Sequence, residues 1–332
     1  MLSVPLGAKI LNTCAIGLFA KLDHMVYDVH TIALATHLSI APSRQELVLL
    51  DDSLTLDEQV AYKLIEKFIA RPDVKAIQNP RGYQPHGTKD RDGNYTGYYE
   101  WTLEDVLAHL AGTKTFGHYL LDKDNTCKLF AFDIDLNKTG MIPTLPMPEM
   151  YEGNSPQQLD DDAAGMWTDS FQERDLIAAW HNREDPARPY LKHAMKSYAH
   201  VLQRAIVDLQ IPSAVAYSGN KGVHVYGFCG RMPAEEVRIG AKIALDSLPM
   251  EPIRGDIFWA WNDNETFQEH KLFTVEVFPK QDTISNEGGF GNLMRLPLGV
   301  NLKNPEDPTF FVDMDTTRGV LSSIDPLVAL DF

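Results

Sequence analysis

The sequence predicts an α+β protein with a mixed or largely antiparallel sheet that is flanked by helices. Segments with the periodicity of amphipathic helices alternate with short apolar runs that are typical of strands. Some of these runs are joined by short turns, which predicts hairpins rather than the long crossovers of a doubly wound parallel sheet. With 332 residues, one large domain or two smaller ones are expected.

Capping residues and periodicity predict four helices. Thr55 and Glu58 form a capping box that begins the first helix, and Thr102 caps the second. Apolar residues at helical spacing mark the third, and a proline followed by two glutamates favours the start of the fourth. The expected helices are Thr55–Ala70, Leu103–Leu110, Leu191–Leu209 and Pro233–Leu248.

Apolar runs bounded by turn residues predict six strands. Residues 79–98 are dense in Gly, Pro, Asn and Asp and predict a long loop or a hairpin. Residues 1–50 show no clean period and receive no assignment. The expected strands are Thr115–Leu121, Lys128–Asp135, Ala214–Tyr217, Val223–Phe228, Leu272–Phe278 and Leu293–Leu298.

The formal net charge of −16 argues against a nucleic-acid partner when it is taken alone. Residues 149–185 hold ten acidic and two basic residues and so contribute half of this charge. We interpret residues 137–189 as an acidic, solvated insertion; docking of a partner protein through Trp167 and Trp180 is the alternative. The remainder is still acidic, so a bound polynucleotide requires a local basic groove or metal ions.

The cysteines and the hydrophobic runs limit where the protein acts. Cys14, Cys127 and Cys229 form no C-x-x-C pair, which supports neither a zinc site nor a disulfide framework and indicates a reducing, cytoplasmic setting. No apolar run is long enough to span a bilayer, and the N-terminal segment lacks the basic region of a signal peptide. No membrane partner is therefore expected.

The segment KLFAFDID, residues 128–135, is the most informative part of the chain. Because side chains alternate faces along a strand, Asp133 and Asp135 share one face, while Phe132 and Ile134 point to the other. Two carboxylates about 7 Å apart at the backbone can converge on divalent cations. The alternative is a pair of acids that face solvent at the end of a strand.

The motif SGNKGVH lies between two expected strands. Gly219 and Gly222 permit a tight turn whose backbone amides can face an anion. Lys221 supplies a positive charge, and Ser218 and His224 supply hydrogen bonds, so the set suits a polyphosphate. The alternative is an ordinary hairpin with an exposed lysine, and the spacing is not that of a Walker P-loop.

Glu276 stands at the centre of another apolar strand, FTVEVFP. Val275 and Val277 occupy one face of it, which leaves Glu276 on the other face with Thr274. A half-buried acid paired with a surface lysine is the alternative. Together with the two aspartates, Glu276 completes the carboxylate set that two-metal phosphoryl or nucleotidyl transfer requires. Oxygen ligands favour Mg²⁺ or Mn²⁺ over zinc.

In this order, FDID, SGNKGVH and VEVFP resemble the three catalytic motifs of the archaeo-eukaryotic primase superfamily, the primase-polymerases. The lead-in to the first motif and the tail FPKQD…GNLMRLPLG are similar to the branch found in phage-type and conflict-system primases. The resemblance covers about Trp101–Asn304 apart from the acidic insertion. It implies a catalytic core in residues 101–332 with an RNA-recognition-motif-like sheet, and an N-terminal αβ portion in residues 1–100 that completes the cleft.

The resemblance also implies a role for each matching residue. Asp133, Asp135 and Glu276 would ligate two catalytic Mg²⁺ or Mn²⁺ ions. The implied substrates are a nucleoside or deoxynucleoside triphosphate and a single-stranded DNA template, joined in a DNA primase-polymerase reaction during DNA replication. The residues expected at the nucleotide, with the phosphate-contacting arginine last, are Ser218, Gly219, Lys221, Gly222, His224 and Arg295.

Several other residues receive weaker assignments. Gly291 and Asn292 are expected to shape a turn near the site. Trp259 and Trp261 are candidates for stacking on bases, although a place in the core is the favoured interpretation.

The sequence departs from the superfamily in three ways that leave other functions open. Glu276 stands where aspartate is common, the cysteine pairs of a zinc cluster are missing, and without a Walker motif a separate helicase is expected to unwind the template. One alternative is a non-catalytic module that binds nucleotide or DNA in replication. The other is a metal-dependent phosphoesterase or nuclease, which usually adds a positioned base or further His and Asp ligands.

Overall fold

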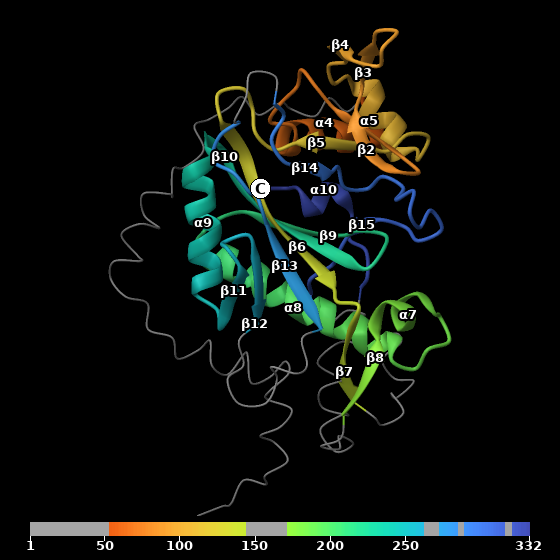
Figure 1. Cartoon of the computed structure of the whole chain (residues 1–332), viewed down its shortest axis with the longest axis vertical. Coiled ribbons are helices and arrows are strands. Elements are labelled where there is room, and N and C mark those ends of the chain that lie inside the picture. Colours follow the sequence, from red (N-terminus) through yellow and green to blue (C-terminus); the bar gives the residue numbers. More distant parts are fainter. Residues whose placement is uncertain (1–52, 144–170, 262–271, 285–288, 316–320) are drawn as a thin grey trace, which may run out of the picture.

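The computed structural model describes residues 53–143, 171–261, 272–284, 289–315 and 321–332 (Figure 1). The unassigned residues 1–50 and Trp167 lie outside these ranges. Within them, six helices accompany four antiparallel sheets, which confirms the α+β class. The helices are α4 Leu56–Phe68, α5 Leu103–Leu110, α7 Leu176–His181, α8 Arg188–Asp208, α9 Ala234–Asp246 and α10 Pro326–Ala329.

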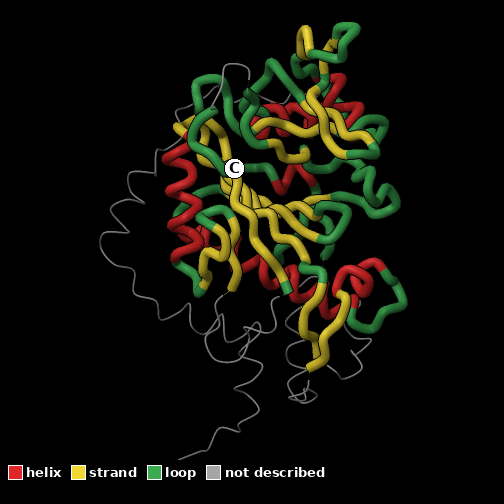
Figure 2. Tube along the Cα trace, in the orientation of Figure 1, coloured by secondary structure: helices red, strands yellow, loops and turns green. Residues whose placement is uncertain are grey.

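A seven-stranded sheet with the order β11-β12-β13-β6-β10-β9-β15 forms the centre of the molecule (Figure 2). The strand that carries the two aspartates, β6, lies between β13 and β10, so it is central in the sheet. The strands are β6 Thr126–Leu136, β9 Ser213–Tyr217, β10 Gly222–Pro233, β11 Met250–Arg254, β12 Phe258–Trp261, β13 Phe273–Phe278 and β15 Phe310–Phe311.

Two helices cover one face of this sheet. Helix α8 packs against β9 and β10, and α9 packs against β6 and β10. The side chains beneath them are apolar and fully buried; they include Phe132, Ile134, Val223, Val225 and Val275. Because side chains alternate along each strand, the polar residues of the same strands lie on the opposite face.

A four-stranded sheet with the order β14-β5-β1-β2 lies beside the central sheet (Figure 1). Its strands are β1 Ala76–Asn79, β2 Gly82–Pro85, β5 Phe116–Tyr119 and β14 Leu293–Arg295. Helices α4 and α5 pack against each other, and α4 also contacts β6. Strands from both sides of residue 100 thus share one sheet, and a domain boundary at that residue stays a prediction.

Two hairpins complete the described part of the chain. Strands β3 (Gly87–Lys89) and β4 (Tyr95–Tyr98) pair within the segment expected to be a loop or hairpin. Strands β7 (Thr139–Pro143) and β8 (Phe171–Asp175) pair in the acidic segment, and α7 follows β8. Trp180 of α7 is 1% exposed, so it belongs to the core and offers no surface for a partner protein.

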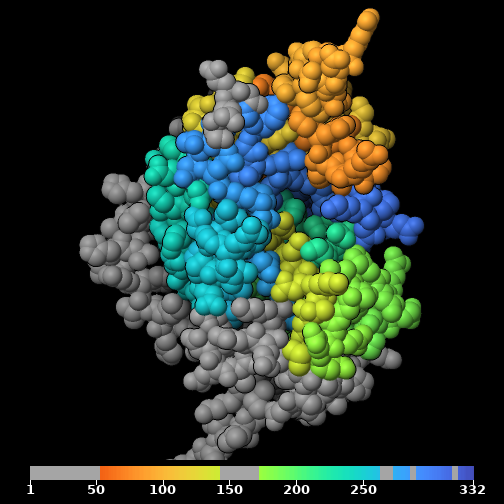
Figure 3. Space-filling model, in the orientation of Figure 1, coloured from red at the N-terminus to blue at the C-terminus, as the bar shows by residue number. Residues whose placement is uncertain are grey.

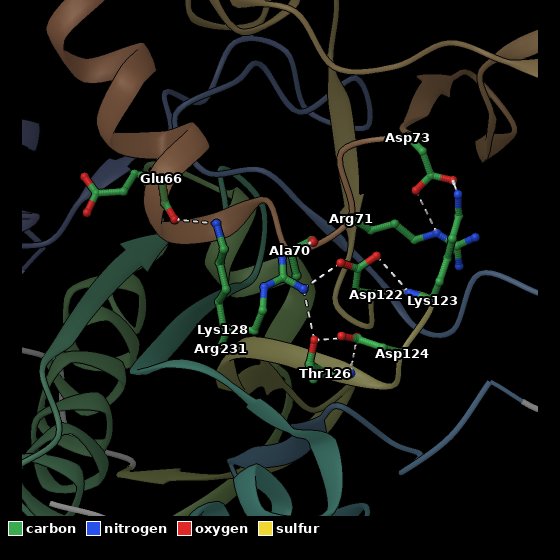
Figure 4. Close-up of polar contacts among 10 residues, drawn as sticks. All are labelled: Glu66, Ala70, Arg71, Asp73, Asp122, Lys123, Asp124, Thr126, Lys128 and Arg231. Carbon is green, nitrogen blue, oxygen red and sulfur yellow. Dashed lines mark hydrogen bonds and ion pairs between the residues drawn. The ribbon is translucent and has the colours of Figure 1, made fainter. Parts of the chain in front are cut away.

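A polar network ties α4 to the central sheet (Figure 4). Arg231 of β10 donates hydrogen bonds to Asp122 at 2.5 Å, to Thr126 at 2.9 Å and to the carbonyl of Ala70 at 2.8 Å. Asp122 precedes β6, Thr126 begins it, and Ala70 follows α4. One guanidinium therefore joins three segments that are distant in the sequence.

The expected elements agree well with the observed ones. The four expected helices agree with α4, α5, α8 and α9 to within three residues at each end. Among the strands, β10 continues to Pro233 instead of ending at Phe228, because a bulge after Phe228 keeps its end paired with β6. Strand β14 ends at Arg295, since Pro297 has no N–H to donate. None of the helices described combines the length and apolarity that a membrane span needs.

Candidate active site

The strand register aligns one residue from each motif on the face of the central sheet opposite to α8 and α9. Asp133 of β6 lies directly opposite His224 of β10 on one side and Glu276 of β13 on the other. Directly opposite residues in antiparallel strands have side chains on the same face, about 5 Å apart at Cβ. His224, Asp133 and Glu276 therefore form a continuous row across three adjacent strands.

A second row lies beside the first. Asp135 is opposite Gly222 of β10 and Thr274 of β13. The side chain of Asp135 is 47% exposed and that of Asp133 is 24% exposed, whereas Ile134 between them is buried. The expected sharing of one face by the two aspartates is thus present. In Figure 3 the yellow segment that contains β6 and β7 is visible between the cyan and light green parts of the chain.

The SGNKGVH segment forms the turn between β9 and β10. The N–H of Ser218 donates to the carbonyl of Gly222 at 3.0 Å and closes the turn. Gly219 has φ +64°, a left-handed conformation that glycine adopts without steric cost. A Cβ at Gly222 would lie 2.2 Å from the carbonyl oxygen of Ile134, so only glycine permits this approach of β10 to β6.

Side chains from neighbouring segments donate hydrogen bonds to the backbone carbonyls of this turn. Trp180 Nε1 donates to the carbonyl of Asn220, and the hydroxyl of Tyr217 donates to the same carbonyl at 3.0 Å. Asn301 Nδ2 and Arg295 Nη2 both donate to the carbonyl of Ser218. The carbonyls of Ser218 and Asn220 thus accept hydrogen bonds from these side chains. The N–H groups of Gly219, Asn220 and Lys221, by contrast, donate to no acceptor among the described residues.

Basic side chains neutralise part of the acidic row. Lys221 Nζ lies 2.7 Å from Asp135 Oδ2, and Lys280 forms an ion pair with Glu276. His224 Nε2 lies 3.4 Å from Asp133 Oδ1, and the other ring nitrogen of His224 lies 2.9 Å from the Tyr226 hydroxyl. Each expected carboxylate thus has a basic neighbour.

The electrostatics of the row are dominated by Asp133. Burial is the main cause that raises the pKa of Asp133 to about 8; the charges of Asp135 and Glu276 act in the same direction, and Lys221 and Arg295 oppose them. Burial lowers the pKa of His224 to about 3, with the positive charge of Arg295 adding to this shift. His224 is therefore neutral at pH 7 and Asp133 is mostly protonated, while Lys221 and Lys280 balance Asp135 and Glu276.

These residues fit divalent cations by their chemistry. Carboxylate oxygens are the ligands that Mg²⁺ and Mn²⁺ prefer, and a bound cation would favour the ionised form of Asp133 and displace the proton that its raised pKa retains. Across the described ranges, no three His, Cys, Asp or Glu side chains are already converged as a metal cluster. Asp135 and Glu276 would have to exchange Lys221 and Lys280 for metal ions.

Arg295 reaches this site from the four-stranded sheet. It ends β14, and its Nη2 donates across to Ser218 in the turn of the central sheet. Its Nη1 is buried and has no hydrogen-bond partner in the described part of the chain. Arg295 therefore places an unused donor between the two sheets.

The structure brings all the predicted site residues together. Gly291 has φ +70°, and Asn292 Oδ1 accepts a hydrogen bond from the N–H of Lys280 at 2.6 Å, so both lie in the connection near the site. Trp259 is 2% exposed and belongs to the core, while Trp261 packs edge-on against Tyr198.

Sequence reasoning missed the supporting residues. Trp180 was assigned to a peripheral insertion, and Tyr217, Tyr226 and Asn301 received no role. Lys280 stands four residues after Glu276, within the FPKQD tail. Because pairing of Glu276 with a lysine was one of the expectations, this spacing could have identified Lys280 as that partner. Trp180 and Asn301 contact the turn from distant segments, which leave no local signal, whereas Tyr217 and Tyr226 lie next to the motif but belong to no recognisable pattern.

One comparison with known proteins found a match. The family model described as the archaeo-eukaryotic primase domain of the TOTE conflict system matches residues 64–250, more than half of the chain. No curated protein matches the chain. The matched residues include Asp133, Asp135 and the turn, whereas Glu276 and Arg295 lie beyond them.

Proposed function

Because the chain belongs to the family of archaeo-eukaryotic primase domains of TOTE conflict systems, we propose that it is a template-directed nucleotidyltransferase. It joins a nucleoside or deoxynucleoside triphosphate to a 3′-hydroxyl on a single-stranded DNA template, and so starts or extends primers in DNA replication. The row of His224, Asp133 and Glu276 carries this proposal, because it places the three motifs of such an enzyme on adjacent strands.

Asp133, Asp135 and Glu276 are the residues that would hold the metal ions. Two Mg²⁺ or Mn²⁺ ions bound there would supply activation of the 3′-hydroxyl and neutralisation of the triphosphate. Lys221 and Lys280, which now pair with two of these carboxylates, become free to contact phosphate oxygens when the carboxylates turn to cations. The lysines thus keep the acidic row neutralised before substrate binds.

The turn from Ser218 to Gly222 would bind the triphosphate. Three of its backbone N–H groups have no acceptor in the described ranges, as an anion-binding turn requires. Arg295 contributes the free Nη1 from the opposite sheet, and neutral His224 contributes a hydrogen bond beside Asp133. We further propose that the central sheet is an RNA-recognition-motif-like core and that a separate helicase supplies unwound template.

Two other functions remain distinguishable by experiment. A non-catalytic module would bind nucleotide or DNA without changing it, and a phosphoesterase or nuclease would shorten a strand. The complete set of three carboxylates speaks against the first, because loss of one acid is the simplest route to inactivity. The second usually adds a positioned base or further His and Asp ligands; His224 of the row belongs to the SGNKGVH motif, which favours a role at the nucleotide instead.

Product lengths from a single-stranded template with labelled nucleoside triphosphates and Mg²⁺ or Mn²⁺ test the proposal. We expect wild-type protein to lengthen a primer or make new strands. The variant Asp133→Asn keeps the size of the side chain and should lose more than about 100-fold in rate, beyond the loss typical of outer-shell metal partners. Binding without any new product, or shortening of the template, would refute the proposal in favour of one alternative.

A further inference from the structure

The hairpin β3–β4 projects beyond the four-stranded sheet (Figure 1). Tyr98 is 39% exposed, and Tyr95 is half-buried three residues before it. A Cβ at Gly87 would lie 2.1 Å from the carbonyl oxygen of Gly97, so glycine here lets the two strands approach closely. The hairpin is thus a tightly built element that presents aromatic rings.

A bulge brings two of these rings to the same side. Residues three apart on a regular strand point to opposite faces. In the hairpin, Thr88 pairs with Gly97 and Lys89 pairs with Tyr95, so β4 contains one extra residue. The rings of Tyr95 and Tyr98 consequently lie 5.2 Å apart between centroids and tilt by only 33°.

The aromatic contacts continue from the hairpin toward the main body. The ring of Tyr98 lies 4.8 Å from that of Phe290, and Phe290 lies 4.9 Å from buried Tyr119 of β5. We call Tyr95, Tyr98 and Phe290 the aromatic strip. The Tyr95 hydroxyl donates to the Pro85 carbonyl at 2.8 Å, which fixes the position of its ring within the strip.

The strip leads to the face that carries Arg295. Tyr119, on which the strip rests, is paired with Leu293 in β14, and Gly117 is paired with Arg295. Alternation along β14 puts Leu293 and Arg295 on one face of the four-stranded sheet, together with Tyr119. Because Arg295 contacts the turn beside the acidic row, the aromatic strip extends outward from the candidate active site.

Positive charges accompany the rings. Lys89 Nζ lies 4.4 Å from the centroid of the Tyr95 ring, and the Arg71 guanidinium lies 5.1 Å from that of Phe290. Lys89 and Arg91 at the exposed end are balanced in charge by Asp90 and Asp92. The Asp90 carboxylate accepts hydrogen bonds from backbone N–H groups within the hairpin turn. The hairpin therefore has no net charge from these four residues, and its aromatic rings are the surface that can bind a ligand.

We propose that the aromatic strip binds the bases of single-stranded nucleic acid and guides the template strand into the active site. Aromatic rings beside a few cations are the usual platform for single strands, because every base has a face that can stack. This inference rests on the proposed function only for the direction in which the strand runs. Binding itself requires neither metal nor nucleotide.

Fluorescence anisotropy with labelled single-stranded oligothymidylate, without divalent cations or nucleotides, tests the strip directly. We expect Tyr98→Ala to raise the Kd roughly tenfold, as is typical for loss of one stacked base. Tyr98→Phe keeps the ring and should bind like wild type. Tyr99→Ala is the matched control: Tyr99 is 46% exposed and next in the chain, but its ring contacts His86 and not the strip.

Salt dependence separates stacking from phosphate contact. Tyr98→Ala should leave the slope of log Kd against log salt unchanged, whereas Lys89→Ala should reduce its magnitude by about one. Melting temperatures verify that each variant is folded. Absence of oligonucleotide binding by wild-type protein, or equal Kd values for Tyr98→Ala and Tyr99→Ala, would overturn the inference.

The same variants distinguish failure of the strip from failure of the proposed function. If the strip binds template but no strand is extended, oligonucleotide binding still weakens in Tyr98→Ala while wild type makes no product. If the protein is a polymerase and the strip plays no part, Tyr98→Ala extends primers with wild-type KM for template.

Discussion

At the scale of single residues, His109 is buried and gains hydrogen-bond partners only when the protein folds. Its Nδ1 accepts a hydrogen bond from the N–H of Phe116 at 3.0 Å, and its Nε2 lies 3.1 Å from the carbonyls of Leu296 and Pro297. A Cβ at Gly299 would lie 2.0 Å from the ring. The imidazole is therefore neutral with its proton on Nε2, and it fixes the segment that follows β14.

Acid should destabilise the protein through this histidine. Burial lowers the pKa of His109 from 6.5 to about 4. Above pH 6.5 the imidazole of His109 is neutral in both the folded and the unfolded state, so its titration does not reduce the free energy of unfolding there. Between pH 6.5 and 4 the unfolded state binds a proton that the folded state does not, so the free energy of unfolding falls by roughly 3 kcal/mol.

Urea unfolding at several pH values measures this effect. His109→Gln, which cannot titrate, should show a smaller decrease in the free energy of unfolding over this pH range than wild type. Other groups with shifted pKa values, such as His118, His224 and, with the opposite sign, Asp133, titrate in both proteins, so the difference between the two curves reports His109. Parallel curves for wild type and variant would contradict the assignment.

At the scale of elements, α7 supports the turn between β9 and β10. Trp180 of α7 is buried, and its Nε1 donates to the Asn220 carbonyl inside the turn. The acidic segment thus contributes a structural residue to the candidate active site, although its charge predicts a solvated insertion.

Removing this hydrogen bond should weaken nucleotide binding. Trp180→Phe keeps most of the ring but leaves the Asn220 carbonyl without its indole donor, so the turn becomes less ordered. We expect the KM for nucleoside triphosphate to rise roughly threefold to tenfold, the effect of one hydrogen bond, with kcat little changed. Steady-state incorporation kinetics measure both constants.

Trp261→Phe provides the matched control, because Trp261 lies on β12 and contacts Tyr198 instead of the turn. Its KM should equal that of wild type. An equal change in both variants would mean that Trp180 acts through general stability and not through the turn.

The elements that the sequence predicts are those with a local signal. The capping box of α4, the Thr102 cap of α5 and the apolar face of α8 predicted their positions, and alternation placed Asp133 and Asp135 on one face. The short strands β1, β2, β11, β12 and β15 were not predicted. All of them have five residues or fewer, which is too short for a clear alternation; β1 with β2 and β11 with β12 form local hairpins, and β15 pairs with the distant β9.

The same distinction holds for the candidate site. The three motifs name the carboxylates and the turn, but the register that aligns Asp133 with Glu276 is set by hydrogen bonds between strands about 140 residues apart. Arg295 was identified from the tail, whereas its contact with Ser218 joins two different sheets. Such contacts follow from tertiary packing and cannot be inferred from a local pattern.

At the scale of the whole molecule, two sheets meet around one acidic row. The central sheet supplies the carboxylates and the turn, and the four-stranded sheet supplies Arg295 and, beyond it, the aromatic strip. A protein with a net charge of −16 repels a polyanion at long range. Bound metal ions, individual basic side chains and aromatic stacking on bases would offset this repulsion at the site.

Glu276 tests this arrangement most directly, because it lies beyond residues 64–250 of the family match and enters the site through the pairing of β13 with β6. The decisive measurement is template-dependent incorporation of labelled nucleotide by wild type and by Glu276→Gln, with melting temperatures as the folding control. We expect wild type to incorporate nucleotide and the folded variant to lose more than about 100-fold in rate. Equal incorporation by both proteins would contradict the three-carboxylate site, and none by either would contradict nucleotidyl transfer itself.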